Sequence, residues 1–401
     1  MTEIEKTAFD LIRAAASGSP YEIPETADLA MLYRIVRRQH LSAFLWEYAS
    51  RLPDSPVRRA WERDKELAAL KNLTYTEEKE NVDRALSAAG IRFLYLKGSV
   101  LKRLWGDPSF RYMGDMDFLY EGDDTALRRA LESVGYTAKN FTSRDFSHHF
   151  VFAKDPWFSL EPHFELFDSD DPYAGKLTGL FDRATPDPAL PGRFDISEED
   201  LYLHCLLHAR KHIVHGGIGV RSFLDFVFLF RAYPDLSERE RVRAFLSDEG
   251  LESFETRVRR VVSLLSDPSL APDGEDEEEF SALFCAGLFG TAEKQFGNQL
   301  KTESGRSRFP RLRFLLKRAF PPLVSMAHRK IRAPLSWIVY PFYWVRRLFL
   351  MLFSRNRRNN TKASLQAVAS FKKDRDSMGR ELRYFSIFSE EKSRGEEARR
   401  D

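Results

Sequence analysis

The 401-residue chain is poor in cysteine and has no long apolar run. Cys205 and Cys285 are its two cysteines, too few for a disulfide framework or a four-cysteine zinc ribbon. We therefore expect a reducing compartment. The uncharged segment Ala333–Val345 has thirteen residues, whereas a membrane-spanning helix needs about 20. The sequence thus contains no evident spanning helix.

An export signal and internal repeats are also missing. The start, MTEIEKTAFD, is acidic where a signal peptide would be basic and then apolar. We therefore expect a cytoplasmic protein. Apolar residues make up 43% of the chain and charged residues 30%, a balance that is typical of folded proteins rather than disordered ones.

Acidic residues are almost absent from one late segment. Residues 301–360 hold 15 Lys and Arg against one acid, Glu303, while the remainder holds 47 basic and 59 acidic residues. This asymmetry predicts an anionic partner, either a membrane surface or a nucleic acid. Aromatic side chains between basic ones make residues 333–354 a candidate for peripheral membrane contact. The alternative is a basic helical layer that packs on the acidic body.

The pattern of apolar residues predicts an α+β protein. Residues 1–90 show a period near 3.6, as in Leu67, Leu70 and Leu73, which indicates helices. We expect a small mixed β-sheet core at 91–195, a helical domain at 196–300, the basic aromatic helical segment at 301–360 and a polar tail at 361–401. Helical regions therefore flank the sheet on both sides along the chain. The run 273–279 (DGEDEEE) is interpreted as an acidic linker.

Short apolar runs mark the expected strands of the core. These lie at residues 91–96, 115–120, 149–153 and 158–166. The first run ends at Lys97-Gly98-Ser99, where Ser99 could cap a helix. Asp123 and Asp124 open the helix after the second run, and Gly135 ends it.

Asp115 and Asp117 are the first candidates for chemistry. Residues i and i+2 of a strand point to the same face, so the two carboxylates lie side by side. Such oxygen ligands suit Mg²⁺ (or Mn²⁺), which takes substrate phosphates as further ligands. An ordinary exposed strand with two acids would show the same pattern. The turn Lys97-Gly98-Ser99 strengthens the first interpretation, because glycine permits close approach of a ligand and lysine supplies positive charge.

Residues 94–120 (LYLKGSVLKRLWGDPSFRYMGDMDFLY) resemble the DNA polymerase β-like nucleotidyltransferase superfamily, and more closely a bacterial family of uncharacterised nucleotidyltransferases. The shared features are an LKG turn, a short helix, an arginine before DxD and an apolar strand. A later acid–x–His–aromatic motif matches Glu161, His163 and Phe164. A helix with histidines and an Arg…Asp pair matches His208, His212, Arg221 and Asp225. The resemblance covers roughly residues 90–230.

This resemblance implies a nucleotidyltransferase core and a role for each matched residue. Asp115, Asp117 and Glu161 would be catalytic and hold the metal, and Lys97, Gly98, Ser99 and Arg111 would bind the nucleotide. His163, His212, Arg221 and Asp225 are expected around that site. The implied reaction moves a nucleotidyl group from an NTP, with ATP among the expected donors, to an acceptor hydroxyl and releases pyrophosphate. The acceptor is left open among a small molecule, a glycan precursor, a protein and an RNA.

The third acid has a rival, and its strand has an unusual residue. Glu165 shares the parity of Glu161, although Glu161 precedes His163 by two residues as the family motif requires. Pro162 removes a backbone donor, which predicts an edge strand or a bulge.

The histidines and the Arg…Asp pair also have plain interpretations. His204, His208 and His212 are spaced four apart on one helix face, but no glutamate follows the first histidine as in a metalloprotease helix. A packing role is therefore favoured over zinc. Arg221 and Asp225 are most simply a surface ion pair on a helix.

Two other function classes fit parts of the pattern. A DxD glycosyltransferase also binds a divalent ion and a nucleotide diphosphate, but it would need a longer parallel sheet before the DxD. A non-catalytic binding protein could retain the fold, although the intact acids and turn argue against that.

Overall fold

The computed structural model describes residues 1–287, except 142, 143, 145, 146 and 170, together with residues 312, 315, 316 and 380–387. They fall into two compact units, residues 1–209 with 220–284 and residues 210–219 with 285–401. The whole sheet belongs to the first unit. Residues 333–354 lie outside the described part of the chain, so the membrane interpretation stays a prediction. None of the described helices is both long and apolar enough to cross a membrane.

The first 90 residues are helical, as the sequence predicted. Local signals set the ends of these helices: Thr2 and Glu5 form a capping box at the first. Ser55 caps the fourth helix, whose first residue is Pro56. The helices are α1 (Glu3–Ser17), α2 (Leu29–Arg38), α3 (Trp46–Ala49) and the long α4 (Pro56–Ala88).

The leucines that indicated α4 do not lie on its buried face. Leu67, Leu70 and Leu73 are 47%, 49% and 66% exposed. The helix buries positions before and after them, and these positions include Trp61, Tyr75, Glu78, Val82 and Leu86. Periodicity therefore identified the helix correctly but not the part of it that meets the core.

A seven-stranded mixed sheet forms the centre of the first unit, in the order β3-β4-β5-β2-β1-β7-β6. Strand β1 pairs antiparallel with β2, and β2 pairs parallel with β5. This confirms the α+β class with a small mixed sheet. The strands are β1 (Arg92–Tyr95), β2 (Met116–Glu121), β3 (Thr137–Asn140), β4 (Val151–Lys154), β5 (Phe158–His163), β6 (Thr185–Pro186) and β7 (Arg193–Asp195).

Three short strands escaped the sequence analysis, and the ends of the four predicted strands differ from the expected ones. Strands β3, β6 and β7 have two to four residues, which is too short for a clear alternation. Strand β2 begins at Met116, so Asp115 precedes it. Strand β5 ends at His163, which leaves Glu165 beyond the sheet.

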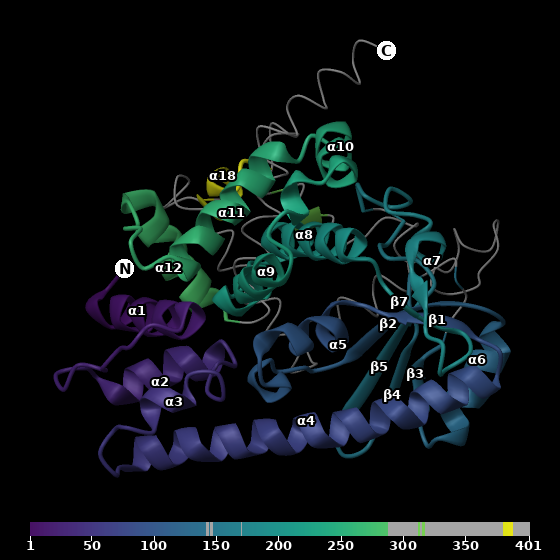
Figure 1. The fold of residues 1–401 in the computed structure, drawn as a ribbon, viewed down its shortest axis with the longest axis horizontal. Helices are drawn as coiled ribbons and strands as arrows, with labels where there is room; N and C mark the ends of the chain where they lie inside the picture. The colour runs from purple at the N-terminus through teal and green to yellow at the C-terminus, as the bar shows by residue number, and fades with distance from the viewer. Residues whose placement is uncertain are drawn as a thin grey trace. The chain divides into compact units, whose positions relative to one another are not determined.

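The two faces of the sheet differ in chemistry. Helices α4 and α6 (Asp124–Ser133) pack on one face, where Met116, Phe118 and Leu160 belong to the hydrophobic core. Figure 1 shows α4 running along this side of the strands. Because side chains alternate along a strand, Asp117 and Glu161 project from the opposite face. The cluster of polar residues is thus built on the face away from α4.

Pro162 does not lie in an edge strand, and that expectation was wrong. Strand β5 lies between β4 and β2, and the register shift of this sheet lies between β3 and β4. The Phe150 N–H donates to the Pro162 carbonyl at 2.9 Å, while Pro162 has no N–H to return. The Phe150 carbonyl therefore receives no hydrogen bond from Pro162. Because Phe150 lies just before β4 begins, the proline removes a single hydrogen bond at the end of this strand pair.

Helices follow the sheet, as expected after residue 195. The run 273–279 is not a linker, because α12 begins within it at Gly274. Asp276 is buried and binds Arg260 at 2.7 Å, and acids are favoured in the first turn of a helix. The remaining elements are α5 (Lys97–Leu101), η1 (Lys102–Trp105), η2 (Pro108–Phe110), α7 (Leu180–Arg183), α8 (Glu198–His215), α9 (Val220–Ala232), η4 (Leu236–Glu238), α10 (Glu240–Asp248), α11 (Glu252–Ser266), α12 (Gly274–Ala286) and α18 (Arg380–Tyr384).

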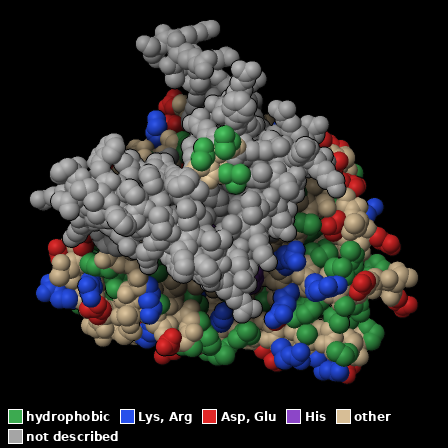
Figure 2. Space-filling view, turned by 180° about the vertical axis from the view of Figure 1, so that it is seen from behind, with side chains coloured by type: hydrophobic (Ala, Val, Ile, Leu, Met, Phe, Trp, Pro, Cys, Tyr) green, Lys and Arg blue, Asp and Glu red, His purple; other side chains and the backbone are tan. Residues whose placement is uncertain are grey.

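The described surface mixes side-chain types. In Figure 2, the described part of this face carries Lys, Arg, Asp and Glu side chains among hydrophobic ones.

The exact subdivision predicted for the chain, with boundaries at residues 90, 195, 300 and 360, stays a prediction.

Candidate active site

Asp117 and Glu161 are directly paired across two neighbouring strands. They are Cα register partners in the parallel pair β2–β5, so their side chains leave the same face of the sheet. Asp117, Glu161 and His163 each place a ligand atom within 4.8 Å of the others. Two carboxylates at this spacing can hold a divalent cation, and the imidazole lies beside them.

Asp117 contacts two neighbours that can stabilise its charge. The Lys97 Nζ lies 3.3 Å from its Oδ2, and the His163 Nε2 lies 3.6 Å from its Oδ1. Burial raises the pKa of Asp117, but the positive charge of Lys97 and the contact with His163 outweigh it and lower the pKa well below its usual value. Asp117 is therefore ionised at neutral pH.

Asp115 has the opposite electrostatic character. Burial, followed by the negative charge of Asp117, raises the pKa of Asp115. Asp115 is not part of the close group formed by Asp117, Glu161 and His163. The three acids predicted to share a metal are therefore arranged as a close pair with Asp115 beside it. A cation near Asp115 would relieve the repulsion.

The turn after β1 is anchored on Asp117. The Leu96 N–H donates to the Asp117 carbonyl at 2.9 Å, and Lys97 forms the ion pair described above. Lys97 has a φ of 28°, which is rare for a residue with a side chain and is found where the surroundings enforce it. Helix α5 begins at Lys97, so Ser99 lies inside it and is not its cap; Leu96 holds the capping position.

Gly98 has a structural reason to lack a side chain. A Cβ at this position would lie 3.1 Å from the Arg111 Nη1 and 3.6 Å from the Met113 Cγ. The neighbouring Ser99 is 2% exposed, and its hydroxyl has no hydrogen-bond partner among the described residues. Because buried polar groups are nearly always paired, this hydroxyl is free to donate to a phosphate in the expected nucleotide-binding turn.

Arg111 is locked in a buried ion pair. Its Nε and Nη2 donate to the two carboxylate oxygens of Asp225 at 2.6 and 2.8 Å. The Trp105 Nε1 donates to the same carboxylate at 3.0 Å. Arg111 and Asp225 are both buried, so the pair fixes the long segment between the turn and β2. The expected contact of Arg111 with a nucleotide stays a prediction.

Arg221 and Asp225 are not the surface ion pair that their spacing suggested. Both are buried, and Asp225 pairs with Arg111 rather than with Arg221. The Arg221 Nη1 instead donates to the Tyr112 carbonyl at 2.8 Å. Burial and the nearby charge of Arg111 lower the pKa of Arg221 to about 10.

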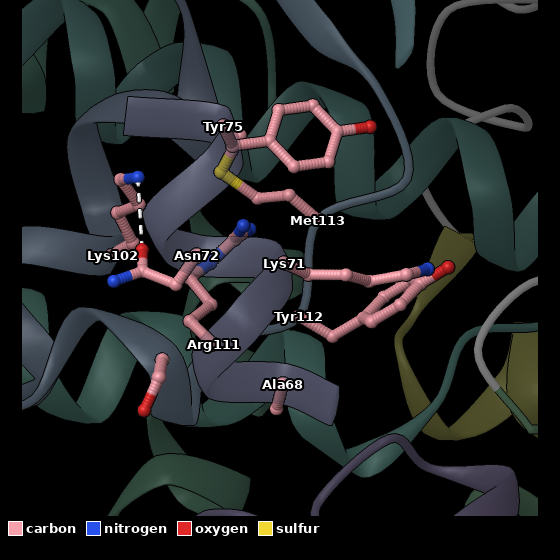
Figure 3. Close-up of a pocket in the computed structure, with 9 residues that line it drawn as sticks. Ala68, Lys71, Asn72, Tyr75, Lys102, Arg111, Tyr112 and Met113 are labelled. Atoms are coloured by element: carbon pink, nitrogen blue, oxygen red, sulfur yellow. Dashed lines mark hydrogen bonds between the residues drawn. The ribbon is translucent and has the colours of Figure 1, made fainter. Parts of the chain in front are cut away.

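A small pocket opens between α4 and the segment that leads to Asp115. Figure 3 shows Lys71 extended beside Tyr112 and the hydrogen bond from Lys102 to Asn72. Lys102 is buried, and burial with the nearby charges of Lys79, Arg103 and Arg111 lowers its pKa. The lining residues are Ala68, Lys71, Asn72, Tyr75, Lys102, Ser109, Arg111, Tyr112 and Met113. Because Asp225 already pairs with Arg111, Lys71 and Lys102 are the lining cations that suit an anionic group.

The other expected residues are spread more widely. Glu165 is exposed and lies beyond β5. His204 and His208 share a face of α8, with ring centroids 6.2 Å apart. His212 belongs to the second unit, so its place beside the site stays a prediction.

The structure adds three polar residues that the sequence analysis did not select. His149 pairs with His163 across an antiparallel bridge, and its Nε2 lies 3.8 Å from the Glu161 Oε2. His148 lies beside it and contacts Asp168. The adjacent pair His148-His149 before a strand was the available signal, but its partner strand could not be read from the sequence.

Comparison with known proteins gives a match to a protein family. No match was found among curated proteins, and none among solved structures. A family described as "Uncharacterised nucleotidyltransferase" matches residues 25–266, which include the turn, the acids of β2 and β5, and the Arg111–Asp225 pair. Nucleotidyltransferases generally use divalent metals, and an acidic site with a histidine is present here. With more than half of its length matched, the chain belongs to this uncharacterised nucleotidyltransferase family.

Proposed function

We propose that the chain transfers a nucleotidyl group from an NTP to an acceptor hydroxyl, with Mg²⁺ or Mn²⁺ as cofactor. The observation that carries this proposal is the register pairing of Asp117 with Glu161, with Asp115 two residues before Asp117. A divalent cation bound there would neutralise phosphate charge and orient the reacting oxygens. Carboxylate oxygens are the ligands that these cations prefer.

The roles of the acids follow from their surroundings. Asp117 stays ionised because Lys97 and His163 support its charge, which makes it the firmest ligand. Glu161 lies beside His149 and His163 and is the candidate that takes the proton of the acceptor hydroxyl. The acceptor oxygen would attack the α-phosphorus, the bond to the bridging oxygen would break, and pyrophosphate would leave with that electron pair.

Positive charge near the acids supports an NTP donor. Lys97 lies 3.3 Å from Asp117 and could exchange this partner for a phosphate when a cation takes the carboxylate. The unpaired Ser99 hydroxyl lies two residues further along the turn. The small pocket beside α4 is lined by Lys71 and Lys102 and offers two cations for an anionic group of the acceptor.

The glycosyltransferase alternative fits the structure less well. The strand before the DxD strand is β1, which is antiparallel to it, and helices α1 to α4 precede β1. A long parallel sheet before the DxD is therefore missing from the described residues. A non-catalytic role is an outcome of the experiment below.

The test is transfer of label from each NTP. The full-length protein would be incubated with each α-³²P-labelled NTP and Mg²⁺ or Mn²⁺, alone and with an extract of small molecules, glycans, proteins and RNA. We expect label to move to one class of acceptor, with pyrophosphate formed in equal amount. Label transfer from a nucleotide sugar instead would support the glycosyltransferase.

Two variants control this experiment. Asp117→Asn should lose the activity, and Glu165→Gln, which changes an exposed carboxyl beyond β5, should retain it. Transfer that persists in Asp117→Asn would point to a contaminant or to another site. Binding of NTP without any transfer across all acceptor classes would favour the non-catalytic alternative.

A further inference from the structure

Three histidines converge beside the carboxylates. His163 ends β5, His149 lies opposite it in an antiparallel bridge, and His148 adjoins His149. Their ring centroids are separated by 4.4 Å (His148–His149), 5.0 Å (His149–His163) and 5.3 Å (His148–His163). Each ring offers a nitrogen within 4.8 Å of a nitrogen of the other two. Each neutral imidazole carries one N–H donor and one lone pair, and both need partners when the ring is buried.

The distance between one nitrogen of His148 and one nitrogen of His149 matches the distance between two ligands of the same metal ion. The His148 Nε2 and the His149 Nδ1 are 3.2 Å apart. Two nitrogens bound to tetrahedral zinc at about 2.0–2.1 Å lie roughly 3.3 Å from one another. A hydrogen bond between the two rings would have a similar length, so this distance needs independent support.

His163 supplies that support. Its side chain is 9% exposed, and neither ring nitrogen has a hydrogen-bond partner among the described residues. The Asp117 Oδ1, at 3.6 Å, lies beyond hydrogen-bond length. Buried polar groups are nearly always paired. A buried imidazole whose two nitrogens have no hydrogen-bond partner among the described residues, beside two other imidazoles, therefore points to a metal-binding role.

The contact of His148 with Asp168 orients one ligand. The His148 Nδ1 lies 2.5 Å from the Asp168 Oδ1. A carboxylate at this position keeps the proton on Nδ1, which leaves the lone pair of Nε2 directed at His149. Metal-binding histidines in proteins commonly have such a carboxylate on their other nitrogen.

We propose that His148, His149 and one ring nitrogen of His163 bind a divalent transition-metal ion of the zinc type. The Mg²⁺ or Mn²⁺ of the proposed reaction would then be held by the oxygens of Asp115, Asp117 and Glu161, so His163 would serve the new site. Imidazole nitrogen favours zinc, cobalt and nickel over magnesium, which prefers oxygen. The ion would tie the segment before β4 to the end of β5. It would thereby hold the strand that carries Glu161 in place.

The experiment uses cobalt as a spectroscopic probe. Untagged full-length protein would be stripped with a chelator and titrated with Co²⁺, whose visible absorption distinguishes tetrahedral from octahedral coordination. We expect one equivalent to give the tetrahedral bands, which Zn²⁺ then removes and millimolar Mg²⁺ does not. Absence of these bands, together with no tight Zn²⁺ binding by calorimetry, would overturn the proposal.

Variants assign the ligands. His148→Gln and His149→Gln should each weaken Co²⁺ binding at least tenfold, and Asp168→Asn should weaken it by roughly 10- to 100-fold. His215→Gln is the matched control, because His215 is exposed and its Nδ1 contacts the Lys211 carbonyl; it should bind normally. Thermal unfolding of each metal-free variant checks its fold, and unchanged binding in folded His148→Gln and His149→Gln would refute the assignment.

The readout is independent of nucleotidyl transfer. Metal binding at the histidines without transfer from any NTP would leave this site intact and count against the proposed function. Nucleotidyl transfer without tetrahedral Co²⁺ binding would support the proposed function and count against the histidine metal site.

Discussion

Asp115 and Asp117 lie two residues apart, and the structure shifts their pKa values in opposite directions. Burial and the charge of Asp117 raise the pKa of Asp115 above its ordinary 3.8. Lys97 and His163 lower that of Asp117 despite its burial. One carboxylate is thus stabilised by the protein itself, whereas the other carries a charge that the protein alone does not compensate.

The first prediction concerns the stability of Asp115→Asn. A raised pKa in the folded state means that folding favours the protonated form of Asp115 over the ionised form. The contribution of Asp115 to stability is therefore fully present below pH 3.8 and is lost as the pH rises through the raised pKa. At neutral pH the variant should be more stable by about 1 kcal/mol, or roughly 1–3 °C in Tm. Differential scanning calorimetry without metal would measure this.

The same variant should respond less to cations. Wild-type protein should gain Tm with Mg²⁺ or Mn²⁺ because a bound ion favours the folded state, and Asp115→Asn should gain less. The stability advantage should disappear on acidification to below pH 3.8. A variant that is less stable than wild type at neutral pH would contradict the uncompensated charge.

The second prediction is that Asp117→Asn disturbs the turn as well as the chemistry. The change removes the ion-pair partner of Lys97, a residue with a φ of 28° at the start of the turn. We expect a loss on the order of 2 kcal/mol in the free energy of unfolding, measured by urea denaturation. The contribution of ionised Asp117 to the free energy of unfolding should be present above pH 3.8. It should decrease as the pH falls through the lowered pKa of Asp117.

Lys97→Gln is the companion measurement. It removes the same ion pair from the other side and should cost a similar amount, while the double variant should cost less than the sum of the two. Additive costs would show that the ion pair contributes nothing to the turn.

The third prediction separates Glu161 from Glu165. Glu161 is paired with Asp117 in the register of the sheet, whereas Glu165 is exposed beyond β5. Glu161→Gln should lower kcat by roughly 10²- to 10⁴-fold and Glu165→Gln by less than about threefold. The assay is the labelled NTP transfer described above, and a reversed order would place the third acid at Glu165.

The fourth prediction tests the close approach of Gly98 to Arg111. An alanine Cβ would lie 3.1 Å from the Arg111 Nη1, and Arg111 cannot yield easily because two hydrogen bonds fix it on Asp225. We expect Gly98→Ala to cost about 1–3 kcal/mol in chemical denaturation.

Gly114→Ala provides the control for this crowding. Its nearest neighbour would be the Tyr112 Cε1 at 3.9 Å, an ordinary contact, so its cost should be below about 1 kcal/mol. Equal costs for the two alanines would show that crowding at Arg111 is not the reason for glycine at position 98.

The sequence by itself determined the helical start, four of the seven strands and the main candidate residues. Alternation within a strand is a local property, so DMD alone predicts that Asp115 and Asp117 face away from Met116 and Phe118, and both of these are buried. The Lys97-Gly98-Ser99 turn and the motif at Glu161 and His163 identified the family for the same reason, because they are short and contiguous.

The tertiary structure decided which distant residues meet. The partner of Asp225 is Arg111, 114 residues away, although Arg221 stands at the helical spacing, because packing buried one arginine against the carboxylate and directed the other to a carbonyl. The place of Pro162 in an interior strand and the exposure of Leu67, Leu70 and Leu73 likewise depend on which elements become neighbours. Strand order and register arise from packing free energy summed over the whole core, and no local pattern in a sequence contains that sum.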